Sequence, residues 1–336
     1  MSEPDALDLL PTPSLVVESS VLDANLAAMD AVRPGRSLRP HVKAFKCTSL
    51  ARRLVDDGHP ALCAATPREI EGLVEAGVGD DLLLANESLD VARLGALADR
   101  ARITVAIDSD ATLDAAVRGG VRSVLVDVEV GLPRCGCAVD DAGRLAERAR
   151  AAGLEVRGVM GYEGHLMMVD ERAERVERVG AAMERLRRAA DDVGGDVVSG
   201  GGTGTFDTNT WCTEIQAGSY TLMDTQYLRL DLPFELALGV LATVISVSSR
   251  GWIVLDAGLK ALGMDHGDPE WADGEVLFCS DEHTTARPTE PGAWSVGDRV
   301  RLRPAHVDPT VAKHEAMWLV DGEAVVDRWP VDLRHW

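Results

Sequence analysis

Short apolar segments alternate with longer amphipathic segments rich in Ala, Arg and Glu from residue 38 to about residue 220, and this alternation limits the possible folds most strongly. Apolar runs between helical segments are typical of parallel strands joined by helices. We expect eight strands in this stretch: residues 38–44, 61–66, 81–86, 102–107, 123–130, 155–164, 196–202 and 214–220. Eight such units predict an α/β fold with a (β/α)8 barrel, whose functional residues lie at the carboxyl ends of the strands.

The pattern changes after about residue 230. Apolar segments continue there, but turns rather than helices separate them, which predicts a mostly β region. The apolar segment at residues 14–19 (SLVVES) precedes the barrel and is surplus to its eight strands, so we expect it to join the C-terminal strands. We therefore predict two domains: a barrel at residues 20–229, and a β-domain made of residues 1–19 and 230–336.

The charge of the chain excludes polyanionic partners. Its net charge is −21, and an acidic surface repels nucleic-acid phosphates and anionic lipid headgroups. No apolar stretch approaches the roughly 18 residues of a membrane span. The N-terminal residues include acidic side chains and lack the basic region of a secretion signal. The sequence predicts a cytoplasmic protein that acts on a small molecule.

Lysines are scarce, which narrows the search for a nucleophilic amine. The chain has only four: Lys43, Lys46, Lys260 and Lys313. In the strand expected at 38–44, alternation puts Arg39, His41 and Lys43 on one face, which we expect to point into the barrel. Loss of hydration and neighbouring cations favour condensation of a lysine amine with an aldehyde. Lys43 is the candidate nucleophile, and the alternative is a surface lysine at a strand end.

Two segments containing glycine lie at the carboxyl ends of the last two strands expected in the barrel. They are SGGGTGT (199–205) and QAGSY (216–220). Backbone with few side chains lets N–H groups approach an anion, and Ser and Thr hydroxyls add donors. Barrels commonly bind phosphate at this position. Together the segments predict a phosphate site, although a plain flexible turn explains either one alone.

Three polar residues follow the fifth and sixth expected strands. Arg134 can donate through its planar guanidinium to a cofactor oxygen or a substrate carboxylate. Tyr162 and His165, in the segment GYEGH, are expected at the same end of the barrel, where a histidine can act as acid or base near neutral pH. A surface salt bridge for Arg134 and a structural role for His165 are the alternatives.

The late segment RPAHVDPTVAKHE contains His306 and Asp308, which lie on one face if the segment is an extended strand. One imidazole and one carboxylate, completed by water, suit Mn²⁺ or Mg²⁺ better than a structural Zn²⁺. A hydrogen-bonded His–Asp pair without a metal is the alternative.

Eight segments of the chain, in this order, resemble the D-threonine aldolase and D-serine dehydratase family, the metal-activated branch of the alanine racemase fold: RPHVKAFK, VDVEVGLPRCG, GYEGH, SGGGTGTFD, EIQAGSY, DAGLKALGMD, SDEH and RPAHVDPTV. The resemblance extends from about residue 11 to the C-terminus. It implies a fold type III enzyme, in which a (β/α)8 barrel binds pyridoxal 5′-phosphate (PLP) and a mostly β domain carries the metal ligands.

The resemblance also implies roles for single residues. Lys43 would hold PLP as a Schiff base, Arg134 would lie near the cofactor's O3′, and Tyr162 and His165 would lie near the ring and the substrate, with His165 catalytic. Five residues would surround the phosphate: Gly202, Thr203, Gly218, Ser219 and Tyr220. His306 and Asp308 would bind the divalent metal. Phe45 departs from the pattern, because family members often have histidine there.

The implied activity is PLP- and metal-dependent cleavage of a D-3-hydroxy amino acid of the D-threonine type to glycine and an aldehyde. Dehydratase relatives typically have cysteine and zinc at the position of Asp308, which favours the aldolase. A D-serine or 3-hydroxy-D-aspartate dehydratase, giving keto acid and ammonia, stays open, as does a non-catalytic PLP-binding protein. A racemase usually needs a tyrosine from the β-domain, and none follows Tyr227. The resemblance also leads us to expect a homodimer.

Overall fold

The structure, a computed structural model, describes residues 6–335 and divides into two compact units. What we call the barrel unit consists of Met29–Lys43, Thr48–Gly218 and the described residues from Leu333 onward. What we call the β unit consists of the described residues up to Ala28, Ala44–Cys47 and Ser219–Asp332.

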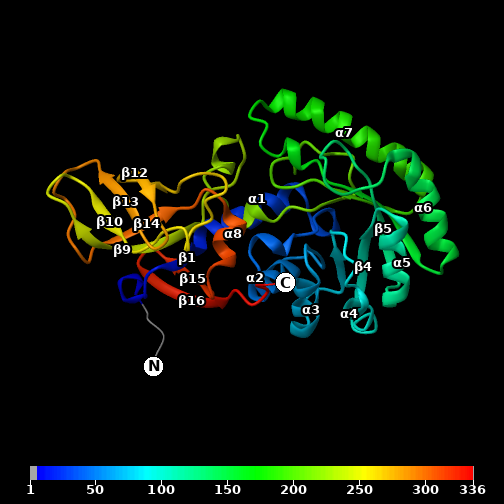
Figure 1. The fold of residues 1–336 in the computed structure, drawn as a ribbon, viewed down its shortest axis with the longest axis horizontal. Coiled ribbons are helices and arrows are strands. Elements are labelled where there is room, and N and C mark those ends of the chain that lie inside the picture. The colour runs from blue at the N-terminus through cyan, green and yellow to red at the C-terminus, as the bar shows by residue number, and fades with distance from the viewer. Residues whose placement is uncertain (1–5, 336) are drawn as a thin grey trace. The chain divides into compact units, whose positions relative to one another are not determined.

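A seven-stranded parallel sheet forms the frame of the barrel unit, and its strands are neighbours in chain order. They are β2 (Ala61–Ala64), β3 (Asp81–Leu84), β4 (Arg102–Ile107), β5 (Ser123–Asp127), β6 (Glu155–Gly161), β7 (Val197–Gly200) and β8 (Glu214–Ile215). The helices of this unit are α2 (Thr48–Asp56), α3 (Pro67–Ala76), α4 (Ala92–Gly95), α5 (Asp110–Gly119), α6 (Val139–Ala151) and α7 (Arg172–Val193). Figure 1 shows α5, α6 and α7 along the outside of the unit. The expected α/β barrel architecture is confirmed.

The first segment expected as a strand, residues 38–44, is not a regular strand. Leu38 makes an isolated parallel bridge to Ile215 of β8, and His41 makes one to Cys63 of β2. Pro40 lies between them and has no N–H to donate, so the ladder is interrupted. Even so, the two bridges place residues 38–41 between the first and last strands of the sheet and close it into a barrel.

An apolar cluster lies inside the barrel unit. One residue from each of strands β2 to β6 contributes to a buried cluster: Cys63, Leu83, Ala106, Leu125 and Met160. The strands pair in parallel, for example Cys63 with Leu83 and Ala106 with Leu125. Short apolar strands of this kind are buried on both faces, which explains why they appear in the sequence as continuous apolar runs.

A buried ionic network lies among the strands of the barrel. Asp81, the first residue of β3, accepts two hydrogen bonds of 2.7 Å from Arg157 of β6. Arg39 donates to Asp81 at 3.3 Å and to Glu214 of β8 at 2.7 Å. Burial by itself would raise the pKa of Asp81, but the hydrogen bonds and charges of Arg157 and Arg39 lower it to about 2. The network ties β3, β6 and β8 to the segment that closes the barrel.

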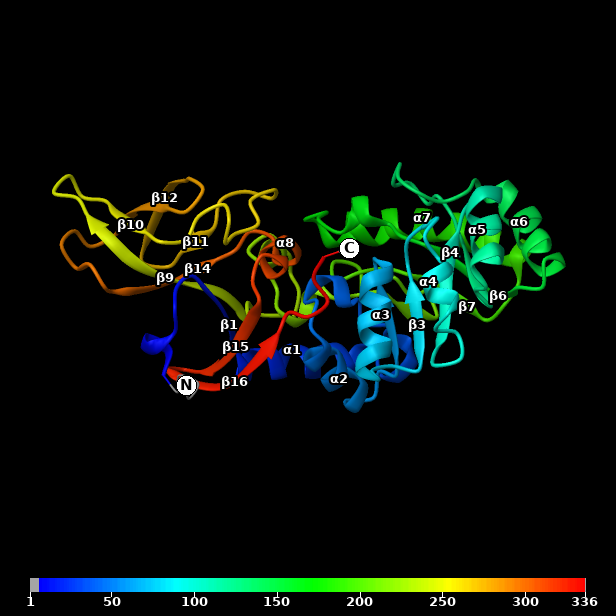
Figure 2. The same ribbon diagram turned by 60° about the horizontal axis from the view of Figure 1, so that its bottom comes forward.

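A nine-stranded sheet forms most of the β unit (Figure 2). Its order is β10-β13-β12-β11-β14-β9-β1-β15-β16, and β10 also pairs with β9. The strands are β1 (Ser14–Glu18), β9 (Leu238–Val247), β10 (Ile253–Leu255), β11 (Glu270–Trp271), β12 (Gly274–Cys279), β13 (Thr284–Pro288), β14 (Arg299–Arg303), β15 (Ala316–Asp321) and β16 (Ala324–Pro330). The short helix α8 (Val307–Ala312) lies between β14 and β15 in the chain.

Strand β1 joins the C-terminal strands, as expected from its surplus in the sequence. It pairs parallel to β15, with Leu15 opposite Met317, and antiparallel to β9, with Leu15 opposite Val240. Helix α1 (Ser19–Val32) follows directly.

The boundaries between the units differ from the predicted domain boundaries. The units change at residues 28/29 and 218/219, whereas the sequence predicts boundaries at 19/20 and 229/230. Residues 219–229 group with the β unit because Leu222 accepts hydrogen bonds from Ala237 and Leu238. The predicted boundaries stay a prediction.

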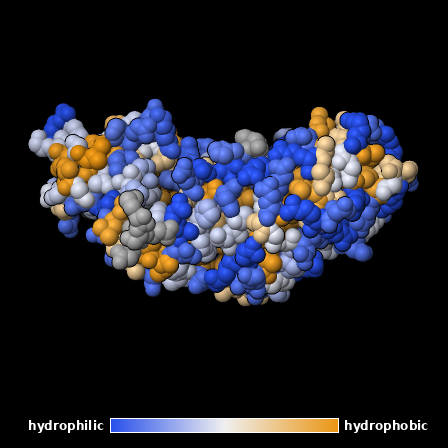
Figure 3. Space-filling view, turned by 90° about the horizontal axis from the view of Figure 1, so that it is seen from below, coloured by the Kyte–Doolittle hydropathy of each residue, from blue (hydrophilic) through white to orange (hydrophobic). Residues whose placement is uncertain are grey.

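Hydrophilic residues cover most of the face seen in Figure 3, with apolar residues in small groups between them. Among residues 6–335, no helix combines the length and the apolar character that a membrane crossing needs.

Candidate active site

Lys43 lies just beyond the segment that closes the barrel. Because residues 38–41 run parallel to β2 and β8, Lys43 follows at the carboxyl end of its segment. It belongs to a 3-10 turn, Val42–Ala44, and its backbone N–H donates to His41 Nδ1 at 3.4 Å. The expectation that Lys43 continues the strand face of Arg39 and His41 is wrong, because the extended backbone ends before residue 42. Arg39 and His41 are buried, whereas Lys43 is half-buried.

A buried glutamate, Glu163, fixes the loop after β7 through hydrogen bonds. Glu163, fully buried, accepts hydrogen bonds from Gly201 N at 3.0 Å, Thr205 Oγ1 at 2.9 Å and Asn209 Nδ2 at 2.8 Å. Thr205 Oγ1 in turn accepts from Gly202 N at 3.2 Å. One carboxylate therefore fixes the course of residues 201–209, which include the segment predicted to bind phosphate.

Close packing adds a second reason for the glycines of this loop. A Cβ on Gly204 would lie 2.1 Å from the carbonyl oxygen of Met167, and one on Gly200 would lie 2.5 Å from that of Gly161. Gly201 has φ +71°, a conformation that favours glycine. The loop is thus a fixed, buried turn. Thr203 in it is buried as well.

The structure brings three of the predicted residues together beside this loop. The guanidinium carbon of Arg134 lies 5.4 Å from the centre of the Tyr162 ring. A Cβ on Gly202 would come within 3.5 Å of the same ring. Arg134, Tyr162 and Gly202 therefore form one neighbourhood at the carboxyl ends of β5, β6 and β7.

His165 is exposed and contacts the loop after β5 instead. A Cβ on Gly131 would lie 2.8 Å from its ring. Partial burial lowers the pKa of His165, and the charge of Arg178 lowers it further, although Glu163 and Glu129 oppose this. A lowered pKa keeps the imidazole neutral, and so able to accept a proton, at neutral pH. Its acid–base role stays a prediction.

Acidic residues at the ends of neighbouring strands form a feature that the sequence analysis missed. Asp127 is the last residue of β5, and its pKa is raised well above the usual range, mainly by burial and also by the nearby Glu87. Asp108 follows β4 and accepts a hydrogen bond of 3.3 Å from Gly136 N. Burial therefore favours the protonated form of Asp127 more than it does for an ordinary aspartate. Acidic residues directly after apolar strands were a signal for this cluster.

In the β unit, His306 and Asp308 do not lie on an extended strand. Strand β14 ends at Arg303, His306 is the N-cap of α8, and Asp308 lies in the first turn of that helix. The turn nevertheless keeps the two side chains close, with His306 Nε2 3.9 Å from Asp308 Oδ2. The two side chains are close together, as expected, but the predicted extended strand is wrong, because the segment begins a helix.

Two residues that the sequence analysis did not single out contact His306. Its Nδ1 lies 2.7 Å from Asp265 Oδ2, and its ring stacks on that of His266 with centroids 3.8 Å apart. Asp265, His266 and His306 thus place potential metal-binding atoms close together. Burial would raise the pKa of Asp265, but the hydrogen bond with His306 lowers it below its usual value.

Residues 218–220 continue from the barrel unit into the β unit. Gly218 is the last residue of the barrel unit's main segment, and Ser219 and Tyr220 open a 3-10 turn in the β unit. Tyr220 is fully buried, and its ring lies 5.5 Å from that of Phe234. The roles predicted for these three residues at a phosphate stay predictions.

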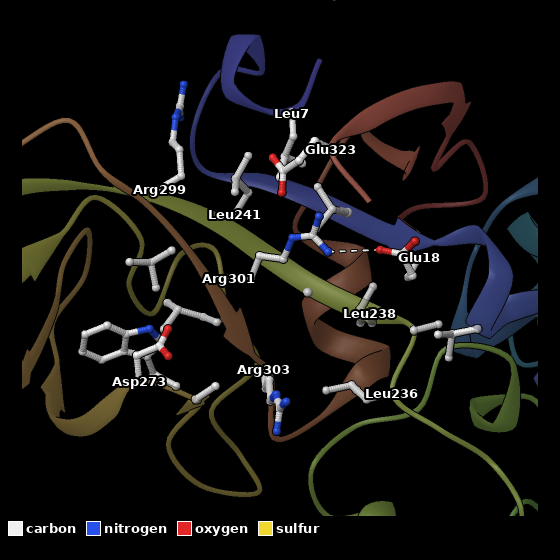
Figure 4. A pocket seen from close by; sticks show the side chains of 18 of the residues that line it. Leu7, Glu18, Leu236, Leu238, Leu241, Asp273, Arg299, Arg301, Arg303 and Glu323 are labelled. Atoms are coloured by element: carbon white, nitrogen blue, oxygen red, sulfur yellow. Dashed lines mark hydrogen bonds and ion pairs between the residues drawn. The ribbon is translucent and has the colours of Figure 1, made fainter. Parts of the chain in front are cut away.

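A separate cavity of about 570 Å³ lies within the β unit (Figure 4). Arg299, Arg301 and Arg303 line it from alternate positions of β14. Arg301 is paired with Glu18 at 3.2 Å, and Arg299 donates to the carbonyls of Asp8 and Leu10. Because acidic residues share the lining and two of the three guanidiniums are already bonded within the unit, we assign no ligand to it.

Comparison with known proteins gives matches along almost the whole chain. Residues 17–226 match the family model "Alanine racemase, N-terminal domain", and residues 237–320 match "Putative serine dehydratase domain". A D-threonine aldolase of Arthrobacter sp is 37% identical, over 98% of this chain and 94% of the relative. A 3-hydroxy-D-aspartate aldolase of Paracoccus denitrificans (strain Pd 1222) is 30% identical, over 96% and 92%.

The solved structures agree with these matches. The crystal structure of D-threonine aldolase from Filomicrobium marinum has a TM-score of 0.91 and 32% identity, and the likeness covers 98% of this chain and 97% of that one.

Proposed function

Because the chain belongs to the D-threonine aldolase and D-serine dehydratase family of PLP-dependent enzymes, we propose that it cleaves D-3-hydroxy amino acids of the D-threonine type to glycine and an aldehyde, with a divalent metal as second cofactor. The observation that carries the proposal is the match to a D-threonine aldolase over 98% of the chain, which includes both the barrel and the segment with His306 and Asp308.

The barrel unit has groups that suit PLP. Lys43 supplies a primary amine at the carboxyl end of its segment, where it would bond covalently to the aldehyde carbon of the cofactor. Glu163 and Thr205 accept from Gly201 N and Gly202 N and fix the buried turn at residues 201–205, which has little side-chain bulk. The phosphate would bind beside this turn, with Gly202, Thr203 and Gly218 as candidate contacts. Ser219 and Tyr220 are further candidates from the sequence.

Arg134 and Tyr162 suit the ring of the cofactor and the substrate. The guanidinium is exposed beside the half-buried phenol ring, so it can donate to the O3′ oxygen or to a carboxylate. PLP, when bound, withdraws electrons from the α-carbon of an amino acid, and the residues around it decide which bond to that carbon breaks.

Cleavage of the Cα–Cβ bond requires a group that takes the proton from the β-hydroxyl of the substrate. We propose His165 for this step, since its lowered pKa keeps the imidazole neutral at neutral pH.

His306 and Asp308 are the proposed metal ligands, because their nitrogen and oxygen atoms are 3.9 Å apart and suit Mn²⁺ or Mg²⁺. A divalent ion in such a site can bind a hydroxyl and lower its pKa.

Product analysis tests the proposal. The PLP-loaded protein is incubated with D-threonine, D-allo-threonine, D-serine and L-threonine, with Mn²⁺ or with a chelator. We expect glycine and acetaldehyde from the D-threonine isomers only, and loss of both products with the chelator or in Lys43→Ala. Lys260→Ala is the matched control, because this lysine is exposed and paired with Glu282 at 2.7 Å. Activity of Lys43→Ala equal to that of the control would contradict the proposal.

A dehydratase is the second candidate, favoured by the match of residues 237–320 to the serine dehydratase domain. It would use the same groups but remove the α-proton and expel the β-hydroxyl, so that keto acid and ammonia appear without glycine. The same assay distinguishes the two activities. A cytoplasmic homodimer stays an expectation, to be tested by light scattering and by fractionation of cells.

A further inference from the structure

We propose that Asp265 and His266 are positioning residues for the metal site: Asp265 fixes the ring of His306 so that Nε2 faces Asp308, and His266 holds the plane of that ring. This inference rests on the metal requirement in the proposed function, but it concerns residues that neither the sequence motifs nor the family resemblance assign to the site.

The two nitrogens of His306 have different neighbours. Nδ1 is 2.7 Å from Asp265 Oδ2, an ordinary hydrogen-bond distance. Since an ionised carboxylate only accepts, Nδ1 is the donor of this hydrogen bond, which leaves Nε2 as the ring nitrogen that can bind a metal ion. Nε2 is 3.9 Å from Asp308 Oδ2, too far for a hydrogen bond. Nε2 and Oδ2 are the two atoms that would hold a divalent ion.

The two carboxylates near His306 also differ in their exposure to solvent. The Asp308 side chain is 17% exposed, whereas that of Asp265 is 56% exposed. Asp308, near Nε2, is thus more protected from solvent, as a metal ligand should be, whereas Asp265, at Nδ1, is more exposed. A carboxylate behind a ligating histidine orients the ring and makes its other nitrogen a better donor.

His266 cannot share one ion with His306 in this arrangement. The two rings are parallel within 8° and their centroids are 3.8 Å apart. An imidazole nitrogen binds a metal through a lone pair in the plane of its ring, so two stacked rings direct their lone pairs along separate planes. His266 therefore restricts tilting of the His306 ring by stacking on its face.

Backbone contacts hold the two segments independently of Asp265. Thr310 Oγ1 donates to the carbonyl of His306 at 2.7 Å and accepts from Gly263 N at 2.9 Å. Asp224 Oδ2 accepts from Val307 N at 3.0 Å. Removal of the Asp265 side chain should therefore free the His306 ring to rotate without unfolding the segments that carry it.

Mn²⁺ binding to PLP-loaded protein that has been stripped with a chelator tests the inference by calorimetric titration. We expect Asp265→Ala to weaken the affinity about 10- to 100-fold. Asp265→Asn should lose less, because its amide oxygen still accepts from Nδ1, and His266→Ala should lose least. Asp268→Asn is the matched control: it removes the same charge from an exposed aspartate three residues away and should leave the affinity unchanged.

The protonation of the His306 ring gives a second readout that a merely structural role would not change. In protein labelled with ¹⁵N-histidine and free of metal, the resonances of His306 should report a proton on Nδ1. In Asp265→Ala they should report a mixture of the two tautomers.

Three outcomes overturn the inference in distinguishable ways. Wild-type affinity in Asp265→Ala, with binding lost in His306→Ala, removes the positioning role and leaves the metal proposal intact. Loss of binding in Asp265→Ala but not in Asp308→Ala would make Asp265 a ligand itself. Absence of Mn²⁺ binding to the wild-type protein defeats both this inference and the metal part of the proposed function, while the PLP part remains testable through Lys43.

Discussion

The two units hold their candidate site residues in different ways. In the barrel unit, a fully buried carboxylate, Glu163, fixes a loop through three hydrogen bonds. In the β unit, His306 is held by Asp265, whose side chain is more than half exposed. A buried hydrogen bond is costly to lose, because its partners are left without water, whereas an exposed one is replaced by solvent. The barrel loop is thus preorganised, and the His306 site depends more on its ligand.

Replacement of Glu163 should produce the largest loss of stability. Glu163→Ala leaves Gly201 N, Thr205 Oγ1 and Asn209 Nδ2 without their acceptor in a buried site. At about 1–3 kcal/mol for each unsatisfied group, we expect a loss of at least 3 kcal/mol in the free energy of unfolding, measured with urea on the protein without cofactor. Affinity for PLP should fall as well, since the loop loses its support.

Two further variants control this experiment. Glu163→Gln keeps one oxygen but points an N–H₂ group at donors, so its loss should be intermediate. Glu177→Ala removes an exposed glutamate in the second turn of α7 and should change stability by less than about 0.5 kcal/mol. Equal stability of Glu163→Ala and Glu177→Ala would show that the loop is not held by Glu163.

The next effect concerns the pH dependence of the barrel. The pKa of Asp81 is lowered to about 2 by its partners, below its value in the unfolded chain. The stabilisation is therefore complete above about pH 4 and is lost as the pH falls toward 2, with a total of about 2 kcal/mol. Unfolding measured between pH 5 and 2 should show this slope in the wild type and a smaller one in Asp81→Asn. Equal slopes would contradict the assignment.

A smaller effect of opposite sign is expected at Asp127. Its raised pKa means that the folded protein resists ionisation of this carboxyl, which is charged in the unfolded chain at neutral pH. Stability is therefore lost as the pH rises from the unfolded pKa toward the folded one. Asp127→Asn should stabilise the protein without cofactor by about 1 kcal/mol at pH 8, and the gain should shrink toward pH 4. A gain that does not depend on pH would point to a cause other than ionisation.

The sequence was sufficient for most of the barrel but not for its first strand. Apolar runs located β2 to β8, because buried parallel strands contain few polar residues. The segment at 38–44 has the same appearance, yet Pro40 breaks its ladder and a 3-10 turn carries Lys43. The position of Lys43 at the carboxyl end of its segment was predicted, whereas the 3-10 turn that carries it was not.

The site shows a similar limit. Pro309 in the first turn of α8 was a signal that His306 and Asp308 start a helix rather than extend a strand, since proline is tolerated at that position. Glu163 and Asp265 lie in the segments GYEGH and DAGLKALGMD, but nothing in the local sequence indicated their partners. Their partners lie 38 to 46 residues away for Glu163 and 41 residues away for Asp265, and in sequence a buried glutamate looks like an exposed one.

The smallest expected change in stability concerns Asp265 in the β unit. Asp265→Ala should lower the free energy of unfolding of the metal-free protein by no more than about 0.5 kcal/mol, because its hydrogen bond to His306 is largely exposed and Thr310 and Asp224 hold the neighbouring backbone. With Mn²⁺ at 100 times the wild-type Kd, the difference should grow to about 1–2.5 kcal/mol, since the wild-type protein gains more from the bound ion. Thermal unfolding with and without the ion measures both values. If the variant were equally destabilised under both conditions, Asp265 would support the fold rather than the ligand, and the contrast with Glu163 would disappear.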